Sequence, residues 1–344
     1  MIVVLKPGML ASVQDLGRHG HRQRGICPGG ALDTLALTMA NRLVGNPDEA
    51  AGLELTMGGC ELRFDTATRI ALAGDDFGAQ LDGMPIWPCW SVPVQAGQTL
   101  KLVGANVAAG KKGMRTWLAV AGGIDVPPVL GSRSTDLKAG FGGLAGRALK
   151  KGDRLPLGAP ALNGAQLTRR RFGVRPPEWA IDGRDFGEAI PLRVMLGPES
   201  GLFTPASLAA MSREPWRITP QSNRMGSRLE GPVLERKRAG DMLSSGVIPG
   251  TIQVPPSGQP IILMGDAQTT GGYPRIAVVI RADLWKLAQA PLGGMLRLVQ
   301  VDAAEALQAR ALQQRHLLQM TQGLAVSGWP VPPTAATHPA VSSD

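Results

Sequence analysis

Short apolar runs separated by glycine- and proline-rich turns dominate the first part of the chain. Runs of this length, bounded by turn residues, are typical of β-strands. The strands expected here cover residues 1–5, 61–64, 69–72, 98–102 and 116–120. Because strands recur about every ten residues in much of this region, the pattern predicts a sandwich or a barrel.

One helix interrupts these strands. Apolar residues recur three and four positions apart between Leu32 and Leu43, which places them on one face of a helix. Asp33 stands near the expected start, and Gly45 followed by Pro47 supplies an end signal.

A second helix signal lies near the C-terminus. Asp302 and Glu305 have the spacing of a capping box, in which two side chains satisfy the first backbone N–H groups of a helix. The helix is expected to run to about residue 320. Leu307, Ala311 and Leu318 are expected on its apolar side.

These patterns predict a mainly β protein with a few helices, of the α+β class. The stretch 156–190 is rich in Pro, Gly and Arg and has no clear period. The expected organisation is an N-terminal β-rich unit with one helix over residues 1–155, a linker or excursion over 156–190, a second β-barrel unit over 191–301, a C-terminal helix over 302–328 and a disordered tail over 329–344.

Composition narrows the classes of function. The chain of 344 residues is 44% hydrophobic, enough to bury a core, and carries a net charge of +9. Its basic residues are scattered and are not interleaved with aromatic residues, so nucleic acid is not an expected partner.

Cysteine usage and hydropathy suggest a compartment. Cys27, Cys60 and Cys89 fit no disulfide framework and no zinc pattern, as is usual in a reducing compartment. The first apolar run is too short for a signal peptide, and no run approaches the roughly 18 residues that a membrane span needs. We expect a cytoplasmic protein without a membrane partner.

Common catalytic motifs are missing. Residues 104–112 resemble a phosphate loop but have five residues between the glycines and Lys112 where Ser or Thr should bind magnesium. The sequence contains neither a nucleophile elbow nor a histidine or cysteine spacing typical of a metal site. No metal ligands are therefore assigned.

The most informative loop lies between two apolar runs, 260–264 and 276–280. It carries Asp266, Gln268, Thr269, Thr270 and Tyr273 among glycines that permit close approach of a ligand. Two readings stay open at this point: a binding loop, or a polar turn whose side chains cap their own backbone.

Three further polar loops place an arginine beside hydroxyl or amide groups. One carries Asp15 and Arg18, the second spans 131–136, and the third contains Ser222, Asn223 and Arg224. Such groups bind carboxylates, phosphates or ureido groups through paired donors. Alternatively, each arginine holds its own loop together.

The chain resembles a known family over about residues 1–300, and the polar loops are part of that likeness. The matching stretches are SVQDLGR (12–18), ANRLVGN (40–46), LAVAGGI (118–124), VLGSRST (129–135), SNRMG (222–226), GVIPGTIQVP (246–255) and GDAQTTGGYP (265–274). The chain resembles the allophanate hydrolase subunit 2, or biotin-dependent carboxyltransferase, family, which includes one component of bacterial ATP-dependent 5-oxoprolinase. Asn223 departs from the family pattern, which often has Asp there.

The resemblance implies a cyclophilin-like β-barrel architecture and two partner proteins. One partner would be a related barrel protein, the B subunit of the same enzyme, and the other would be its separate A subunit. Together the three proteins would open the lactam of 5-oxo-L-proline to L-glutamate with ATP, and magnesium is a candidate companion of the nucleotide. Phosphorylation of the amide oxygen would make the lactam carbon electrophilic. The chain alone would be inactive.

Site roles follow from the resemblance and the loop contexts. Asp266 or Asp15 would orient a proton, Arg224 and Arg18 would hold anionic groups, and Gln268 and Thr269 would bind the amide. The remaining expected substrate contacts are Ser222, Asn223, Thr270 and Tyr273.

Two other functions stay open. The chain could be the carboxyltransferase component of a biotin-dependent urea or amide carboxylase, although it has no biotin-accepting Met-Lys-Met segment of its own. It could also be a non-enzymatic regulator that binds a kinase-inhibitor-like partner, because fold-family likeness constrains chemistry loosely.

Overall fold

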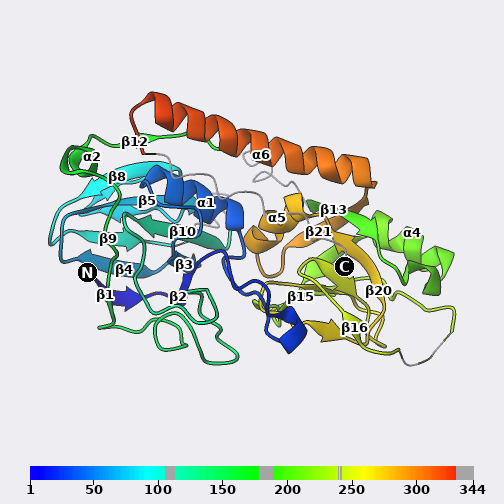
Figure 1. Cartoon of the computed structure of the whole chain (residues 1–344). Helices are drawn as coiled ribbons and strands as arrows, with labels where there is room; N and C mark the ends of the chain where they lie inside the picture. The colour runs from blue at the N-terminus through cyan, green and yellow to red at the C-terminus, as the bar shows by residue number, and fades with distance from the viewer. Residues whose placement is uncertain (105–112, 178–188, 239, 241, 331–344) are drawn as a thin grey trace.

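The computed structural model describes residues 1–104, 113–177, 189–238, 240 and 242–330. Its first unit is a sandwich of two antiparallel sheets (Figure 1). One sheet has the order β11 (Arg154–Leu155), β1 (Ile2–Pro7), β4 (Cys60–Phe64), β9 (Thr99–Leu102), β6 (Gln80–Leu81) and β7 (Met84–Pro85). The other has the order β12 (Phe172–Gly173), β8 (Trp90–Val94), β5 (Thr68–Gly74), β10 (Arg115–Val120), β3 (Gly52–Thr56) and β2 (Leu10–Gln14).

Strand β5 shows how the side-chain period of two builds this unit. Ile70 and Leu72 enter the core between the sheets, together with Phe64 of the facing sheet. The alternate residues, Ala71 and Ala73, belong to the core on the other side, where helix α1 (Thr34–Leu43) packs on the sheet. Small residues at these positions let the helix approach the strands closely.

The helix predicted from the 32–43 pattern is confirmed. Asp33 is its N-cap, and the Asp33 side chain accepts a hydrogen bond of 2.9 Å from the backbone N–H of Ala36. Gly45, just beyond the helix end, has φ +71°, the left-handed conformation expected of a C-terminal glycine.

The second unit is a closed barrel, as expected from residues 191–301. Its seven strands follow the order β13 (Ile190–Leu196), β20 (Arg275–Val279), β17 (Thr251–Gln253), β18 (Ile261–Leu263), β15 (Gly226–Glu230), β14 (Pro215–Ile218) and β21 (Met295–Gln300). A small hairpin of β16 (Ser245–Gly246) and β19 (Thr270–Gly271) lies outside it. The mainly β fold class is therefore confirmed. Of the two barrel units expected, only the second is a closed barrel among the described residues, because the first unit buries its core between two sheets.

The segment expected as a linker returns to the first unit before the barrel begins. It forms α2 (Gly164–Thr168) and then β12, which pairs with β8. The buried guanidinium of Arg69 donates to the carbonyl oxygens of Gln166, Leu167 and Arg169 at the end of α2. Residues 178–188 of this stretch lie outside the described residues.

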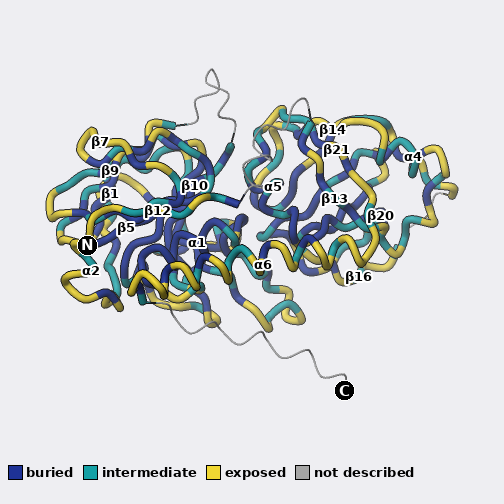
Figure 2. Tube along the Cα trace, turned by 90° about the horizontal axis from the view of Figure 1, so that it is seen from above, coloured by how far each residue is buried: buried dark blue, intermediate teal, exposed yellow. Residues whose placement is uncertain are grey.

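Among the described residues, the helices that accompany the barrel are α4 (Pro205–Arg213), α5 (Leu284–Gln289) and α6 (Ala303–Val326). The short 3-10 turns in the described part of the chain are η1 (Arg22–Arg24), η3 (Ser200–Leu202) and η4 (Arg281–Asp283). Buried residues concentrate inside the two units and at their contact (Figure 2).

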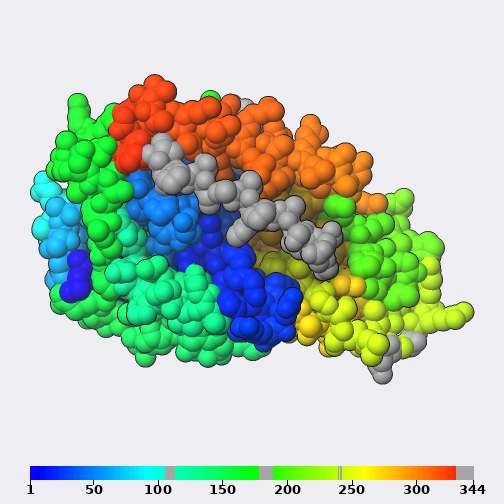
Figure 3. Space-filling model, in the orientation of Figure 1, coloured from blue at the N-terminus to red at the C-terminus, as the bar shows by residue number. Residues whose placement is uncertain are grey.

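Helix α6 runs along one edge of the molecule over both units (Figure 3). The predicted capping box is present, since Asp302 accepts from the N–H of Glu305 and Glu305 accepts from that of Asp302. Gln313 donates to Ala282 of the second unit, and Arg42 of α1 donates to the carbonyl of Leu317.

The predicted apolar side of α6 was wrong. Leu307 and Leu318 are 71% and 52% exposed, whereas the buried positions are Ala309, Gln313, Met320 and Leu324. Leucines and alanines occur all around this helix, so its period did not single out one face. The face is fixed by the two units beneath it.

Of the tail expected over 329–344, residues 331–344 lie outside the described residues, as does most of the 104–112 loop. Among the residues that are described, no helix is both long and apolar enough to cross a membrane.

Candidate functional site at the junction of the two units

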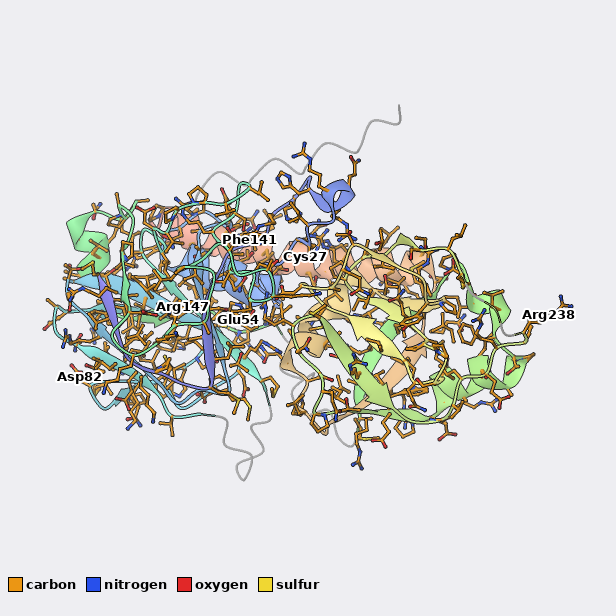
Figure 4. The ribbon with its side chains drawn as sticks, turned by 90° about the horizontal axis from the view of Figure 1, so that it is seen from below. Cys27, Glu54, Asp82, Phe141, Arg147 and Arg238 are labelled. Carbon is orange, nitrogen blue, oxygen red and sulfur yellow. The ribbon has the colours of Figure 1, made fainter. Side chains whose placement is uncertain are left out.

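Four charged side chains meet where the two units join, and we call this set the junction cluster: Glu54, Arg115, Arg224 and Asp266. Glu54 comes from β3 of the first unit, and Figure 4 shows it on the side that faces the second unit. Arg224 follows β14 and Asp266 follows β18 in the barrel. The side chains of Glu54, Arg224 and Asp266 are at most 5% exposed.

Arg224 connects the two units through its whole guanidinium group. Its Nε and Nη2 atoms donate to the two carboxylate oxygens of Asp266 at 2.8 and 2.9 Å. Its Nη1 atom donates to Oε1 of Glu54 at 2.6 Å, and Nη2 also donates to the carbonyl oxygen of Gly30 at 2.7 Å. Arg224 is therefore engaged by protein groups, and its contacts fix the orientation of Asp266.

Arg115 adds a second link between the units. Its Nε atom lies 3.5 Å from Oε1 of Glu54, and its Nη1 atom donates to the carbonyl of Ala288 in α5. Its backbone N–H donates to the side chain of Gln289 at 3.1 Å. A buried, multiply bonded set of this kind makes the junction one rigid surface and not an open hinge.

Burial changes the protonation behaviour of the junction cluster. Burial alone would lower the pKa of Arg224, but Glu54 and Asp266 outweigh this and raise it. Burial lowers the pKa of Arg115, and Glu54 offsets part of that change. Burial also raises the pKa of Asp266, although Arg224 opposes this, and a raised pKa makes a carboxylate a better proton acceptor.

Asp15 organises the neighbouring loop. Its carboxylate accepts from the hydroxyl groups of Ser132 and Ser134 at 2.7 and 2.5 Å, and from the backbone N–H groups of Gly17 and Arg133 at 2.8 and 2.5 Å. These contacts join the end of β2 to the 131–136 loop. Asp15 stands three positions before Arg18 in the chain. Its carboxylate is fully engaged in these hydrogen bonds to protein groups.

Arg18 lies under the same loops and is 1% exposed. Its Nη2 atom donates to the carbonyl of Ser134 at 2.5 Å, and its Cζ atom lies 4.7 Å from the ring centroid of Phe141. The nearby thiol of Cys27 donates to Asp136 at 3.3 Å. Burial and Asp136 raise the pKa of Cys27 to about 11.

Glycine 29 connects this group to the junction cluster. The Cβ of an alanine at position 29 would lie 3.3 Å from Nη1 of Arg18 and 3.7 Å from Oδ1 of Asp266. The structure therefore brings Arg18, Arg224 and Asp266, three of the predicted site residues, into one neighbourhood.

Other predicted site residues lie further out. Gln268 is exposed, Thr270 belongs to the small hairpin, and Tyr273 is 47% exposed. The backbone carbonyl of Thr269 accepts from Val247 beside that hairpin. Gln268, Thr270 and Tyr273 lie on the outer part of the loop that begins with Asp266, whereas Thr269 is buried.

Ser222 and Asn223 remain on their own turn. The Ser222 hydroxyl accepts from the backbone N–H of Arg228 at 3.0 Å, and the Asn223 side chain accepts from that of Met225 at 2.8 Å. The turn therefore positions Arg224, while these two side chains cap its backbone.

Comparison with known proteins decides the family. Residues 24–300 match the profile described as carboxyltransferase domain, subdomain A and B. The chain is 49% identical to the 5-oxoprolinase C subunit of Escherichia coli over 320 residues, covering 93% of this chain and 97% of that protein. The chain belongs to the carboxyltransferase domain family.

More distant members are much longer than this chain. It is 33% identical to a urea amidolyase of Lachancea kluyveri, covering 93% of this chain but 18% of that protein. The crystal structure of the K. lactis urea amidolyase superposes with a TM-score of 0.83 at 29% identity, covering 93% of this chain and 20% of that one.

Several residues of this carboxyltransferase domain were missed by sequence reasoning. Glu54 and Arg115 are chain-distant partners of Arg224 and Asp266, and Cys27 and Asp136 lie near Arg18. The available signal was a charged residue inside an apolar strand, as with Glu54 between Leu53 and Leu55. Among the described residues no three potential metal ligands lie together.

Proposed function

We propose that this chain is the C subunit of a 5-oxoprolinase that opens the lactam of 5-oxo-L-proline to L-glutamate. The observation that carries the proposal is its 49% identity to the 5-oxoprolinase C subunit of E. coli over 97% of that protein. A second relative with the same name, from Haemophilus influenzae, is 40% identical over 97% of its length.

The finer parts of this proposal concern the assembly. We propose a cytoplasmic hetero-oligomer in which separate A and B subunits complete the enzyme, in which ATP drives ring opening, and in which the isolated chain is inactive. The described residues offer no cluster of three metal ligands.

The residues of the junction suit the handling of an amide. Asp266 is buried, is oriented by two hydrogen bonds from Arg224, and has a raised pKa, which suits a group that takes up a proton during hydrolysis. Arg224 acts as its positioning residue. Asp15 holds the loop that carries Arg18. Gln268, Thr270 and Tyr273 extend the surface toward the solvent or a partner, and Thr269 between them is buried.

Reconstitution tests this proposal. The chain would be combined with its candidate A and B partner proteins, and glutamate released from 5-oxo-L-proline would be measured with and without ATP. Release is expected only when the three proteins and ATP are present together. Release that is equal when this chain is left out would overturn the proposal.

The carboxyltransferase component of a biotin-dependent urea carboxylase is the second candidate. Its support is the TM-score of 0.83 to a urea amidolyase. If it is correct, the chain will transfer a carboxyl group between urea and a biotinylated carrier protein, and the complex will not consume 5-oxo-L-proline.

A further inference from the structure

Three consecutive arginines lie beside two tryptophans at the outer edge of the first unit, and we call this set the tryptophan–arginine patch: Trp87, Trp90, Arg169, Arg170 and Arg171. The arginines connect α2 to β12, and β12 pairs with β8, which begins at Trp90. The Cζ atom of Arg171 lies 5.9 Å from the ring centroid of Trp87, and Trp87 is 47% exposed. The ring centroids of Trp87 and Trp90 are 5.7 Å apart.

The backbone beneath the patch is held from inside the unit. The buried Arg69 donates to the carbonyl oxygens of Arg169 and Arg170 at 2.8 and 3.3 Å. The side chain of Arg169 donates to the carbonyl of Ser327 at the end of α6 at 2.9 Å. A surface that is ordered before binding loses less conformational entropy when a partner docks.

The charge of the patch has one sign. The two segments that supply it, 83–98 and 154–177, contain five arginines and no Asp or Glu, and residues 306–330 of the neighbouring helix region add no acid. Such a surface attracts a surface that carries carboxylates. A symmetric contact with a second copy of this chain would instead bring the same arginines of both copies together.

The tryptophans favour a protein partner over a nucleic acid. Single-stranded nucleic acids stack their bases on open aromatic faces. Here Arg171 lies over the ring of Trp87, and a Cβ on Gly173 would lie 2.7 Å from Nε1 of Trp90, so both rings already have a neighbour against a face. Trp and Arg are residue types that concentrate at the energetic centres of protein interfaces.

The other basic run, Arg236 to Arg238, differs in its contacts. Arg236 donates to the carbonyl of Gly240, and Lys237 donates to that of Gly201. Figure 4 shows Arg238 at the end of the barrel that is far from the first unit. This run has the same sequence signal on a different surface, so it provides a matched control.

The patch is separate from the junction cluster. Figure 1 shows α2 and β8 at the end of the first unit away from the barrel. In the sheet order β12-β8-β5-β10-β3-β2, four strand spacings separate β12 from β3, which carries Glu54. At about 4.8 Å for each spacing this is about 19 Å. A partner on the patch therefore leaves the junction free for another protein.

We propose that the tryptophan–arginine patch is the docking surface for an acidic surface of the A subunit. This inference rests on the proposed function, which supplies the two partner proteins. The B subunit, as the related barrel protein that would complete the candidate site, has to reach the junction, where Gln268 and Tyr273 extend outward. The patch at the opposite end is then the surface for the A subunit.

Charge reversal with a matched control tests this surface. The tagged chain is immobilised in the presence of the B subunit, and its affinity for the A subunit is measured. Arg171→Glu is the test and Arg238→Glu is the control, because both arginines are exposed. We expect Arg171→Glu to weaken binding of the A subunit about tenfold or more, and Arg238→Glu to leave it unchanged.

Two further measurements do not depend on that variant. Trp87→Ala removes the aromatic contact without a change of charge, and it should weaken binding of the A subunit to a similar extent. Binding of the A subunit to the wild-type chain should weaken as the salt concentration rises, because the contact joins opposite charges.

The outcomes separate the two proposals. A glutamate-releasing complex in which Arg171→Glu and Trp87→Ala bind the A subunit as the wild type does would overturn the docking surface and leave the 5-oxoprolinase assignment intact. Loss of the B subunit in place of the A subunit would also overturn the docking surface, as would a patch that binds a single-stranded oligonucleotide while the variants retain the A subunit. Binding of the A subunit through the patch without any glutamate release would support the docking surface and overturn the proposed function.

Discussion

The Nη1 atom of Arg224 lies 2.6 Å from Oε1 of Glu54 and joins residues 170 positions apart in the chain. This ion pair is buried and crosses from the barrel to the sandwich, and the same guanidinium orients Asp266. The junction cluster therefore both links the units and presents a fixed carboxylate at their contact.

Removal of Arg224 should destabilise the protein strongly. Arg224→Met leaves the carboxylates of Glu54 and Asp266 buried without the Arg224 guanidinium. Removing one partner of a buried ion pair typically costs about 3–5 kcal/mol. Arg228→Met is the control, because Arg228 is exposed on the next strand, and it should change the free energy of unfolding by less than about 0.5 kcal/mol. Urea denaturation measures both values. Equal stabilities of the two variants would show that the junction does not hold the units together.

The orientation of α6 predicts unequal costs for two leucines. Leu324→Ala opens a cavity at a position that is 4% exposed and should cost about 2–5 kcal/mol. Leu318→Ala, at a position 52% exposed, should cost less than about 1 kcal/mol. Thermal and chemical unfolding of the two variants provide the comparison, and a larger loss for Leu318→Ala would mean that the helix packs through its other face.

Asp283 should make the fold sensitive to acid. Burial alone would raise its pKa, but hydrogen bonds from Arg193 and the charge of Lys286 lower it below the ordinary value. The ionised carboxylate then stabilises the fold above the unfolded pKa of about 3.9, and this stability is lost as pH falls through the folded pKa.

The variant Asp283→Asn checks this effect. It should be less stable at pH 7 and should lose less of its remaining stability between about pH 4 and pH 2 than the wild type does. Asp125→Asn serves as the control, since the Asp125 side chain is 57% exposed. An acid dependence unchanged by Asp283→Asn would contradict the prediction.

Cys27 should resist alkylation in the native protein. With its pKa raised to about 11, roughly one thiol in a thousand is ionised at pH 8, against about one in four for an ordinary cysteine. Iodoacetamide labelling followed by mass spectrometry should find Cys27 modified quickly only after unfolding. Rapid labelling of the native chain would show that the surroundings of Cys27 open to solvent in the folded protein.

The sequence could predict the elements whose signals are local. The helix at Thr34–Leu43 and the start of α6 follow from apolar spacing and from caps formed within three residues. The strands β4, β5, β9 and β10 follow from short apolar runs between turns. Which face of α6 is buried could not be predicted. That face is set by two units that contact the helix from distant parts of the chain.

Local signals also predicted part of the candidate site, and tertiary contacts determine the rest. Asp266, Arg224 and Arg18 stand on glycine-rich loops that indicate function. Glu54 and Arg115 lie within strands, and their pairing with the barrel appears only when the two units meet. The distinction between Arg18, which keeps a free donor among the described residues, and Arg224, which is saturated, is likewise set by tertiary contacts.

The most direct measurement is the rate of ATP-dependent glutamate release by the reconstituted complex when Asp266 alone is changed to Asn. The change keeps the shape of the side chain and removes its ability to take up a proton, so turnover should fall by about 10²–10⁴-fold. Circular dichroism verifies that the variant is folded, and the control Asp125→Asn should keep its activity. Turnover of folded Asp266→Asn equal to that of the wild type would contradict a catalytic site at the junction of the two units.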